Sequence, residues 1–112
     1  MTPNIDFTIY SGDSRSITVI VTDQNNNPVN ISNHTISFAV SNSSTGTVLF
    51  TKTTASGITI TNAVGGIFAI NLTSSDTNTL NGTYDYMIRV TDTLNNSSIV
   101  LTGNMIVKKS TI

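Results

Sequence analysis

Apolar residues that recur at every second position, in short and nearly evenly spaced runs, are the feature that most limits what this chain can fold into. The clearest run follows Gly82, where Tyr84, Tyr86, Ile88 and Val90 occupy alternate positions. Successive side chains of a β-strand point to opposite faces of its sheet, so this run predicts a strand with one buried face.

Comparable runs extend over most of the chain. They lie at residues 5–9, 16–22, 36–40, 48–50, 57–61, 67–72, 84–90 and 99–107, and Val29 with Ile31 adds a short apolar pair. The Gly65-Gly66 pair between two runs predicts a hairpin. Gly103 is expected to mark a β-bulge. Ile20 lies on the opposite face from Val19, which suggests that both faces of its strand are covered.

A helical pattern occurs only at residues 74–80, where Ser74 or Ser75 is the expected N-cap and Leu80 is expected to turn inward. This gives one helical turn at most. Seven to nine short strands at even spacing predict an all-β fold, an antiparallel β-sandwich, rather than βαβ units. With 112 residues, the chain fits a single domain spanning residues 1–112.

The segment around Tyr84 refines this prediction to an immunoglobulin-like antiparallel β-sandwich. In such sandwiches a tyrosine just past a turn begins a central strand, and its hydroxyl bonds to backbone a few residues upstream. Tyr84 is expected to form this corner, and Tyr86 is expected to point into the core. Phe38 and Phe68 are the large aromatic residues expected beside it.

The composition argues against most kinds of chemistry. The chain has no cysteine and a single histidine, so thiolate sites and histidine clusters are excluded. Charged residues make up 10% of the chain, where globular domains have about 25%, and the surface must consist of the hydroxyls and amides of 20 Thr, 14 Ser and 14 Asn. We therefore predict that the protein is not an enzyme and has no catalytic residues, no metal site and no cofactor.

Two polar clusters were weighed as sites. Residues 23–27 (Asp-Gln-Asn-Asn-Asn) are the densest group of oxygen ligands and suggest calcium, but they contain one charge and lack the acidic end of a calcium loop, so a tight turn is favoured. His34 lies beside Ser32 and Thr35, and together with one of the aspartates these residues suggest a catalytic triad. The chain has no nucleophile motif such as Gly-x-Ser-x-Gly, so a histidine in a turn is favoured.

Binding to a glycan, nucleic acid or membrane was also considered. Tyr10, Tyr84 and Tyr86 with nearby hydroxyls would suit a carbohydrate patch, although at least two of these tyrosines are expected in the core. The five basic residues are dispersed and predict no nucleic-acid binding. The apolar runs are too short to span a membrane, and residues 1–6 do not resemble a signal peptide, so the protein is expected to stay in the cytosol where it is made.

The turn and strand motifs together resemble the immunoglobulin-like domains of tailed-phage structural proteins, and they are similar to the N-terminal domain of the phage baseplate upper protein family. The motifs are Gly12-Asp13, Asp23, residues 27–31, residues 57–60, Leu80, Gly82, Tyr84, Tyr86, Gly103 and Ile106-Val107. The resemblance implies a mechanical adaptor that attaches to neighbouring virion proteins and carries no catalytic residues. In that family a receptor-binding segment follows the domain, whereas this chain ends at Ile112.

We therefore expect a virion structural protein of a bacteriophage, a multi-copy module that serves as a capsid decoration, head-fibre, neck or baseplate component. Its expected partners are other virion proteins, copies of itself and, weakly, a host-surface glycan. The expected location is the virion, after assembly in the host cytoplasm. Two alternatives stay open: an immunoglobulin-like module of a bacterial surface adhesin, and a carbohydrate-binding module.

Overall fold

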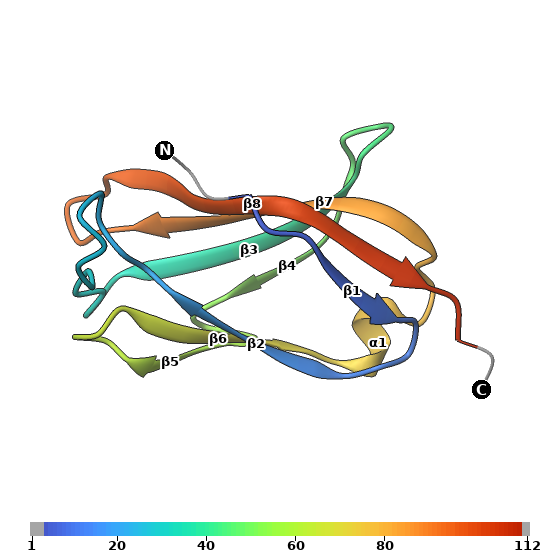
Figure 1. Ribbon diagram of the computed structural model, residues 1–112, viewed down its shortest axis with the longest axis horizontal. Helices are drawn as coiled ribbons and strands as arrows, with labels where there is room; N and C mark the ends of the chain where they lie inside the picture. Colours follow the sequence, from blue (N-terminus) through green and yellow to red (C-terminus); the bar gives the residue numbers. More distant parts are fainter. Residues whose placement is uncertain (1–3, 111–112) are drawn as a thin grey trace.

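Two β-sheets face each other in the computed structural model, which describes residues 4–110 (Figure 1). The first sheet has the order β1 (Phe7–Tyr10), β8 (Ser97–Lys108), β7 (Gly82–Thr91), β3 (Thr35–Asn42) and β4 (Val48–Thr53). The second has the order β2 (Arg15–Ile20), β6 (Ile67–Leu72) and β5 (Ile58–Asn62). These eight strands confirm the all-β class and the immunoglobulin-like sandwich.

One pairing departs from the antiparallel arrangement that was predicted. β1 runs parallel to β8, with Phe7 opposite Met105 and Tyr10 opposite Lys108, while the other strand pairs are antiparallel. β1 leads through a short turn into β2, which belongs to the other sheet. It therefore joins its own sheet beside the last strand of the chain, and alternation within a strand contains no information on that partner.

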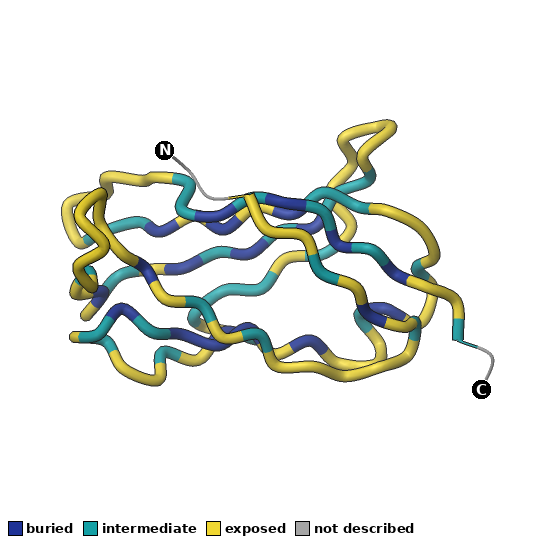
Figure 2. Tube along the Cα trace, in the orientation of Figure 1, coloured by how far each residue is buried: buried dark blue, intermediate teal, exposed yellow. Residues whose placement is uncertain are grey.

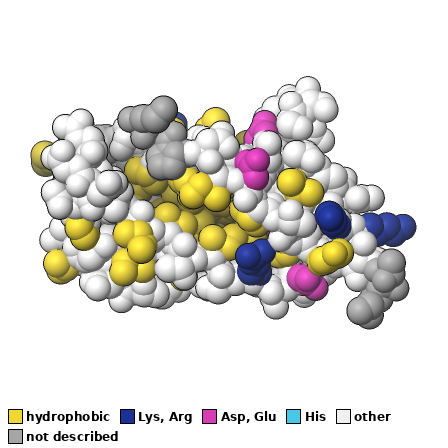
Figure 3. All heavy atoms as spheres, viewed as in Figure 1, with side chains coloured by type: hydrophobic (Ala, Val, Ile, Leu, Met, Phe, Trp, Pro, Cys, Tyr) yellow, Lys and Arg dark blue, Asp and Glu magenta, His cyan; other side chains and the backbone are white. Residues whose placement is uncertain are grey.

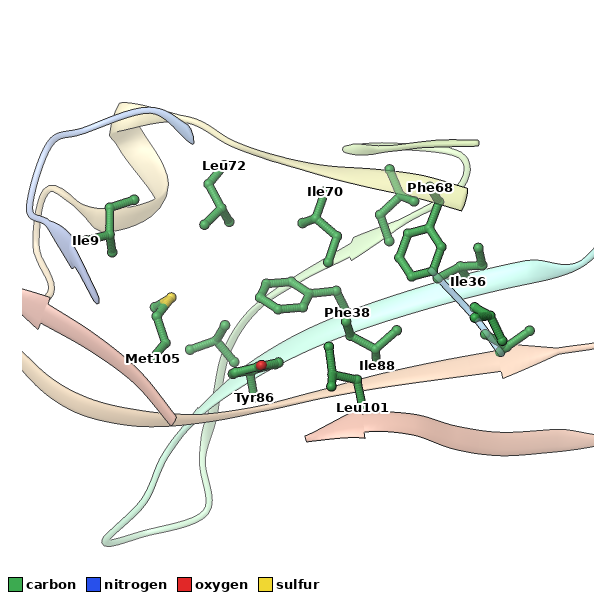
Figure 4. Packing of buried hydrophobic residues seen from close by; sticks show 14 of the residues in the cluster. Ile9, Ile36, Phe38, Phe68, Ile70, Leu72, Tyr86, Ile88, Leu101 and Met105 are labelled. Carbon is green, nitrogen blue, oxygen red and sulfur yellow. The ribbon is translucent and has the colours of Figure 1, made fainter. Parts of the chain in front are cut away.

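The core lies between the sheets and is formed by the inward positions of the alternating runs (Figures 2 and 4). Phe38 and Phe68 are fully buried, as predicted, and Tyr86 is 3% exposed. The ring of Tyr86 packs against Phe38 with centroids 5.7 Å apart and against Phe7 with centroids 5.3 Å apart. Such tilted contacts between rings add to the stabilisation from burial.

The corner at Tyr84 has the predicted geometry. The Asn81 amide donates to the Tyr84 hydroxyl oxygen at 2.9 Å, and that hydroxyl lies 3.2 Å from the Asn81 carbonyl, to which it donates. Gly82 between them has φ of 128°, a conformation that residues with a Cβ rarely adopt. The tyrosine therefore fastens the start of β7 to the turn before it.

The bulge expected at Gly103 lies elsewhere. Gly103 pairs regularly with Tyr86, and the register between β7 and β8 shifts where Ile88 faces Leu101 and Arg89 faces Ile99, which leaves Val100 as the extra residue. A Cβ on Gly103 would lie 1.9 Å from the Ile5 carbonyl oxygen. Gly103 is therefore needed because the Ile5 carbonyl lies directly against it, where the segment before β1 runs parallel to β8.

The helical turn α1 (Ser74–Thr77) is present, but its cap is Thr73 rather than Ser74 or Ser75. The Thr73 amide donates to Asp76 Oδ2 at 2.8 Å, as in a capping box. The position of Asp76 three residues after Thr73 sets this choice. The Gly12 amide donates to the buried Thr77 Oγ1 at 3.0 Å, which ties α1 to the turn after β1.

Two further expectations concern single apolar residues. Ile20 is 58% exposed, so the outer face of β2 is open and the predicted cover on both faces is wrong. Ile31 is fully buried, although the Val29–Ile31 pair forms no strand. Its amide bonds to the Ala63 carbonyl at 2.9 Å, which holds this loop against the sandwich.

The hairpin predicted at Gly65-Gly66 joins β5 to β6 and is confirmed.

Candidate functional site

The Asp23 loop uses its carboxylate to build a turn. Asp23 Oδ1 accepts the Asn25 amide at 2.8 Å and the Asn27 amide at 3.0 Å, and Asn26 has φ of 63°. The bond from the Asn25 amide, two residues on, is that of an Asx turn, and the bond from the Asn27 amide closes the loop, so the favoured turn interpretation is confirmed. Among residues 4–110, no three His, Cys, Asp or Glu side chains gather as a group that could hold a metal ion.

The loop between β7 and β8 repeats this construction. Asp92 Oδ1 accepts the amides of Leu94 and Asn96, both at 2.9 Å, and Asn95 has φ of 65°. The hydrogen bond from the Asn96 amide lowers the pKa of Asp92 below its usual value. The two loops share the pattern Val-Thr-Asp-x-x-Asn-Asn at residues 21–27 and 90–96, a signal that the sequence contained and that the strand-based prediction missed.

His34 lies at the end of the β2–β3 loop, where its amide donates to the Ile31 carbonyl at 3.1 Å. Its Nδ1 is buried without a hydrogen-bond partner in the part of the chain that the structure describes. No hydrogen bond in that part of the chain links the ring to Ser32 or Thr35. The residues of the triad hypothesis are therefore neighbours in sequence that do not form one.

The three tyrosines do not form an aromatic patch. Tyr86 is buried, Tyr84 is half-buried at the corner, and Tyr10 at the end of β1 is 51% exposed. Burial raises the pKa of Tyr86, with a smaller contribution from Asp6, and its hydroxyl donates to the Ile5 carbonyl. Only Tyr10 of the three presents a ring that a sugar could stack on.

An apolar groove with a volume of about 790 Å³ lies between β2 and the first half of β8. Figure 3 shows hydrophobic side chains gathered in this hollow, with few charges around it. One wall consists of Ile17, Val19 and Val21, and the other of Ile99 and Leu101. Tyr86 and Phe7 also border it. We call this feature the β2–β8 groove.

The groove exists because the two sheets are not closed on this side. β2 pairs with β6 on one edge and has no strand partner among the described residues on the other. Ile17 and Val19 point toward the sandwich interior but stay half-exposed, because no strand lies beside them. Arg15 closes one end, where its Nη1 donates to the Thr8 carbonyl at 2.8 Å. The arrangement suits an extended apolar partner rather than a reaction.

Sequence reasoning missed the groove. It predicted the strands that form the walls, but whether a strand has a neighbour on each edge depends on the order of strands in the sheet. The one available signal was Ile20, an apolar residue on the face opposite to Val19. It suggested that both faces of the strand are covered, whereas the structure leaves the outer face of β2 exposed and places β2 at the edge of its sheet.

The comparisons with known proteins leave the family open. No protein-family model matches the chain, and no curated protein does. Among solved structures, fibronectin(III)-like modules of Clostridium thermocellum CbhA are similar, with 12% sequence identity and a TM-score of 0.48 over 97% of this chain and 93% of that chain. Within residues 4–110, no helix has the length and apolar character needed to cross a membrane.

Proposed function

We propose that this chain is a non-catalytic structural module of a bacteriophage virion, present in many copies as a capsid decoration, head-fibre, neck or baseplate component. The observation that carries the proposal is the β2–β8 groove. Its walls are aliphatic and its two charged lining residues, Arg15 and Asp23, lie at its ends. Arg15 binds backbone and Asp23 forms a turn, so neither is arranged for chemistry. Such a groove favours contact with protein.

The near-neutral surface supports close packing of identical copies. The formal net charge is -1, and the exposed strands present mainly hydroxyls and amides. A large net charge would make neighbouring copies repel one another. The resemblance of the turn and strand motifs to tailed-phage domains adds the setting in which dense arrays of such modules are common.

The position of the gene tests the setting. A virion protein is expected to be encoded beside capsid, portal or tail genes. A long reading frame with a signal peptide and repeated domains around this segment would instead identify a module of a bacterial surface adhesin and would overturn the proposal.

The direct experiment is mass spectrometry of purified particles. Peptides of this chain should stay with the particles through a density gradient, together with the known capsid and tail proteins. A chain that is made during infection but is absent from the particles would not be a virion protein.

A further inference from the structure

We propose that a second copy of this chain docks on the open edge of β2, so that the two β2 strands pair antiparallel across a two-fold axis. The inference rests on the proposed function in that it names the surface through which copies would associate. It concerns the contact between copies and not the location of the protein.

β2 is the least protected of the four edge strands of the described fold. Natural sheets block edge pairing with bulges, charges and short strands. β4 has a register shift and carries Lys52, β5 has a register shift before Asn62, and β1 has four residues. β2 pairs with β6 without a shift, and residues 16–20 are uncharged.

The backbone hydrogen-bonding groups of every second residue of β2 face the open side. The Val21 amide donates to the Gly66 carbonyl at 2.8 Å, and the Val21 carbonyl accepts the Val29 amide at 3.0 Å, so the peptide groups of Val21 lie on the β6 side. The N–H and C=O groups of successive residues in a strand point to opposite edges. Ser16, Thr18 and Ile20 therefore present theirs to a new partner.

A second copy matches this edge in one register. With Val19 opposite Val19 of the second copy, Thr18 lies opposite Ile20, and both residues have their peptide groups on the open side. Ile17 then lies opposite Val21, and Arg15 lies opposite Asp23, which pairs opposite charges at both ends. Cross-strand neighbours of this kind stabilise a sheet, whereas like charges oppose pairing.

The neighbouring registers are worse for physical reasons. A shift by two residues in one direction would place Asp13 opposite Asp23, and the same shift in the other direction would place Ile17 opposite Asp23, so either shift removes the contact between Arg15 and Asp23. A shift by one residue would turn the apolar side chains away from the interior face. The pairing centred on Val19 also brings the Ile17, Val19 and Val21 side chains of each copy beside the groove of the other, so the half-exposed wall becomes covered in both copies.

Sedimentation over a protein range of about 1 µM to 1 mM measures the association. The parent protein should show a dimer that dissociates on dilution. Val19→Lys places two ammonium groups together at the axis and should weaken association by about tenfold or more. Val48→Lys changes an exposed valine on the β4 edge and should leave the association of the two copies unchanged. Circular dichroism shows whether each variant is folded. A parent that stays monomeric at the highest concentration would overturn the inference.

Cross-linking tests the register without relying on a destabilising change. The chain has no cysteine, so Val19→Cys introduces a single thiol. Directly opposite residues in a non-hydrogen-bonded antiparallel pair have Cα atoms about 4.5 Å apart, within the range for a disulfide. Under mild oxidation, Val19→Cys should give a covalent dimer about tenfold faster than Val48→Cys, because association raises the local thiol concentration. Equal rates would refute the register.

The two proposals fail in different ways. A monomer in solution that is nevertheless found in purified particles would refute the β2 contact and leave the virion role intact. A β2-linked dimer that is absent from particles would refute the virion role and leave the contact intact.

Discussion

At the scale of single residues, the Tyr84 hydroxyl makes both of its contacts with Asn81, one as acceptor and one as donor. Tyr84→Phe keeps the ring and removes both contacts, so the free energy of unfolding should fall by about 1 kcal/mol in urea denaturation. Tyr10→Phe is the matched control, because Tyr10 is exposed, and it should change stability by less than about 0.5 kcal/mol. Equal effects of the two changes would mean that the corner does not stabilise the fold.

Phe38 provides the test of the core. It is fully buried and packs against Tyr86 and Phe50. Phe38→Ala should lower the free energy of unfolding by about 3 to 5 kcal/mol, through lost burial and the cavity that remains. Val48→Ala, at a position 56% exposed, should change it by less than about 0.5 kcal/mol. A Phe38→Ala protein as stable as the parent would show that β3 presents its other face to the core.

Gly103 is a residue whose role depends on the Ile5 carbonyl that lies against it. Gly103→Ala places a methyl group against the Ile5 carbonyl and should destabilise the protein by about 1 to 3 kcal/mol. Hydrogen exchange at the Ile5 amide should accelerate, since its bond to the Thr102 carbonyl would be displaced. Asn104→Ala, one residue along β8, is the control. An unchanged exchange rate at Ile5 in the Gly103→Ala protein would contradict the close contact between Ile5 and Gly103.

These residues also show what the sequence could predict. The burial of Phe38 and Tyr86 and the corner at Tyr84 follow from alternation and from a turn a few residues away, and all were predicted. The role of Gly103 was misread, because its crowding comes from Ile5, which is distant in sequence. A glycine in a strand has more than one explanation, and only the neighbouring backbone distinguishes them.

At the scale of elements, α1 is fastened to β4 by an ion pair, with Lys52 Nζ 2.7 Å from Asp76 Oδ2. Burial alone would raise the pKa of Asp76, but the hydrogen bonds from Lys52 and Thr73 outweigh it and hold this pKa below its ordinary value of 3.8. A carboxyl with a lowered pKa stabilises the fold above the unfolded value and loses that contribution as the pH falls through the folded value.

The parent should therefore lose stability below about pH 4 more steeply than Asp76→Asn, in urea unfolding measured at several pH values. The difference is expected to be about 0.5 to 1 kcal/mol at pH 7, since the pair is partly accessible to solvent. Lys52→Met removes a group that lowers the pKa of Asp76, so this variant should lose less stability than the parent as the pH falls. Identical pH profiles for the parent and Asp76→Asn would show that the pair does not contribute.

The order of strands is the part of the fold that alternation could not predict. Each strand was found from its own residues, but the parallel position of β1 beside β8 depends on residues about a hundred positions apart in the chain. The β2–β8 groove has the same origin, since it forms between β8 and the edge of β2 that has no strand partner among the described residues, and these two strands come from opposite ends of the sequence. The candidate site could therefore not be predicted from the alternation within each strand, because it depends on which strands lie side by side.

At the scale of the whole molecule, the fold combines a well-formed core with one open side and an almost uncharged surface. The chain has no cysteine, so no disulfide crosses the core, and the open side presents apolar walls and backbone groups of β2 that have no strand partner among the described residues. These properties favour a module that associates with other protein chains. The central claim, that the chain belongs to a phage particle, is a proposal that adds to these properties the resemblance of the turn and strand motifs to tailed-phage domains.

Quantitative mass spectrometry of gradient-purified particles, calibrated with isotope-labelled peptides of this chain and of the major capsid protein, tests that claim most directly. The proposal predicts that the chain stays with the particles and that its ratio to the capsid protein corresponds to many copies in each particle. Absence of the chain from intact particles would contradict it.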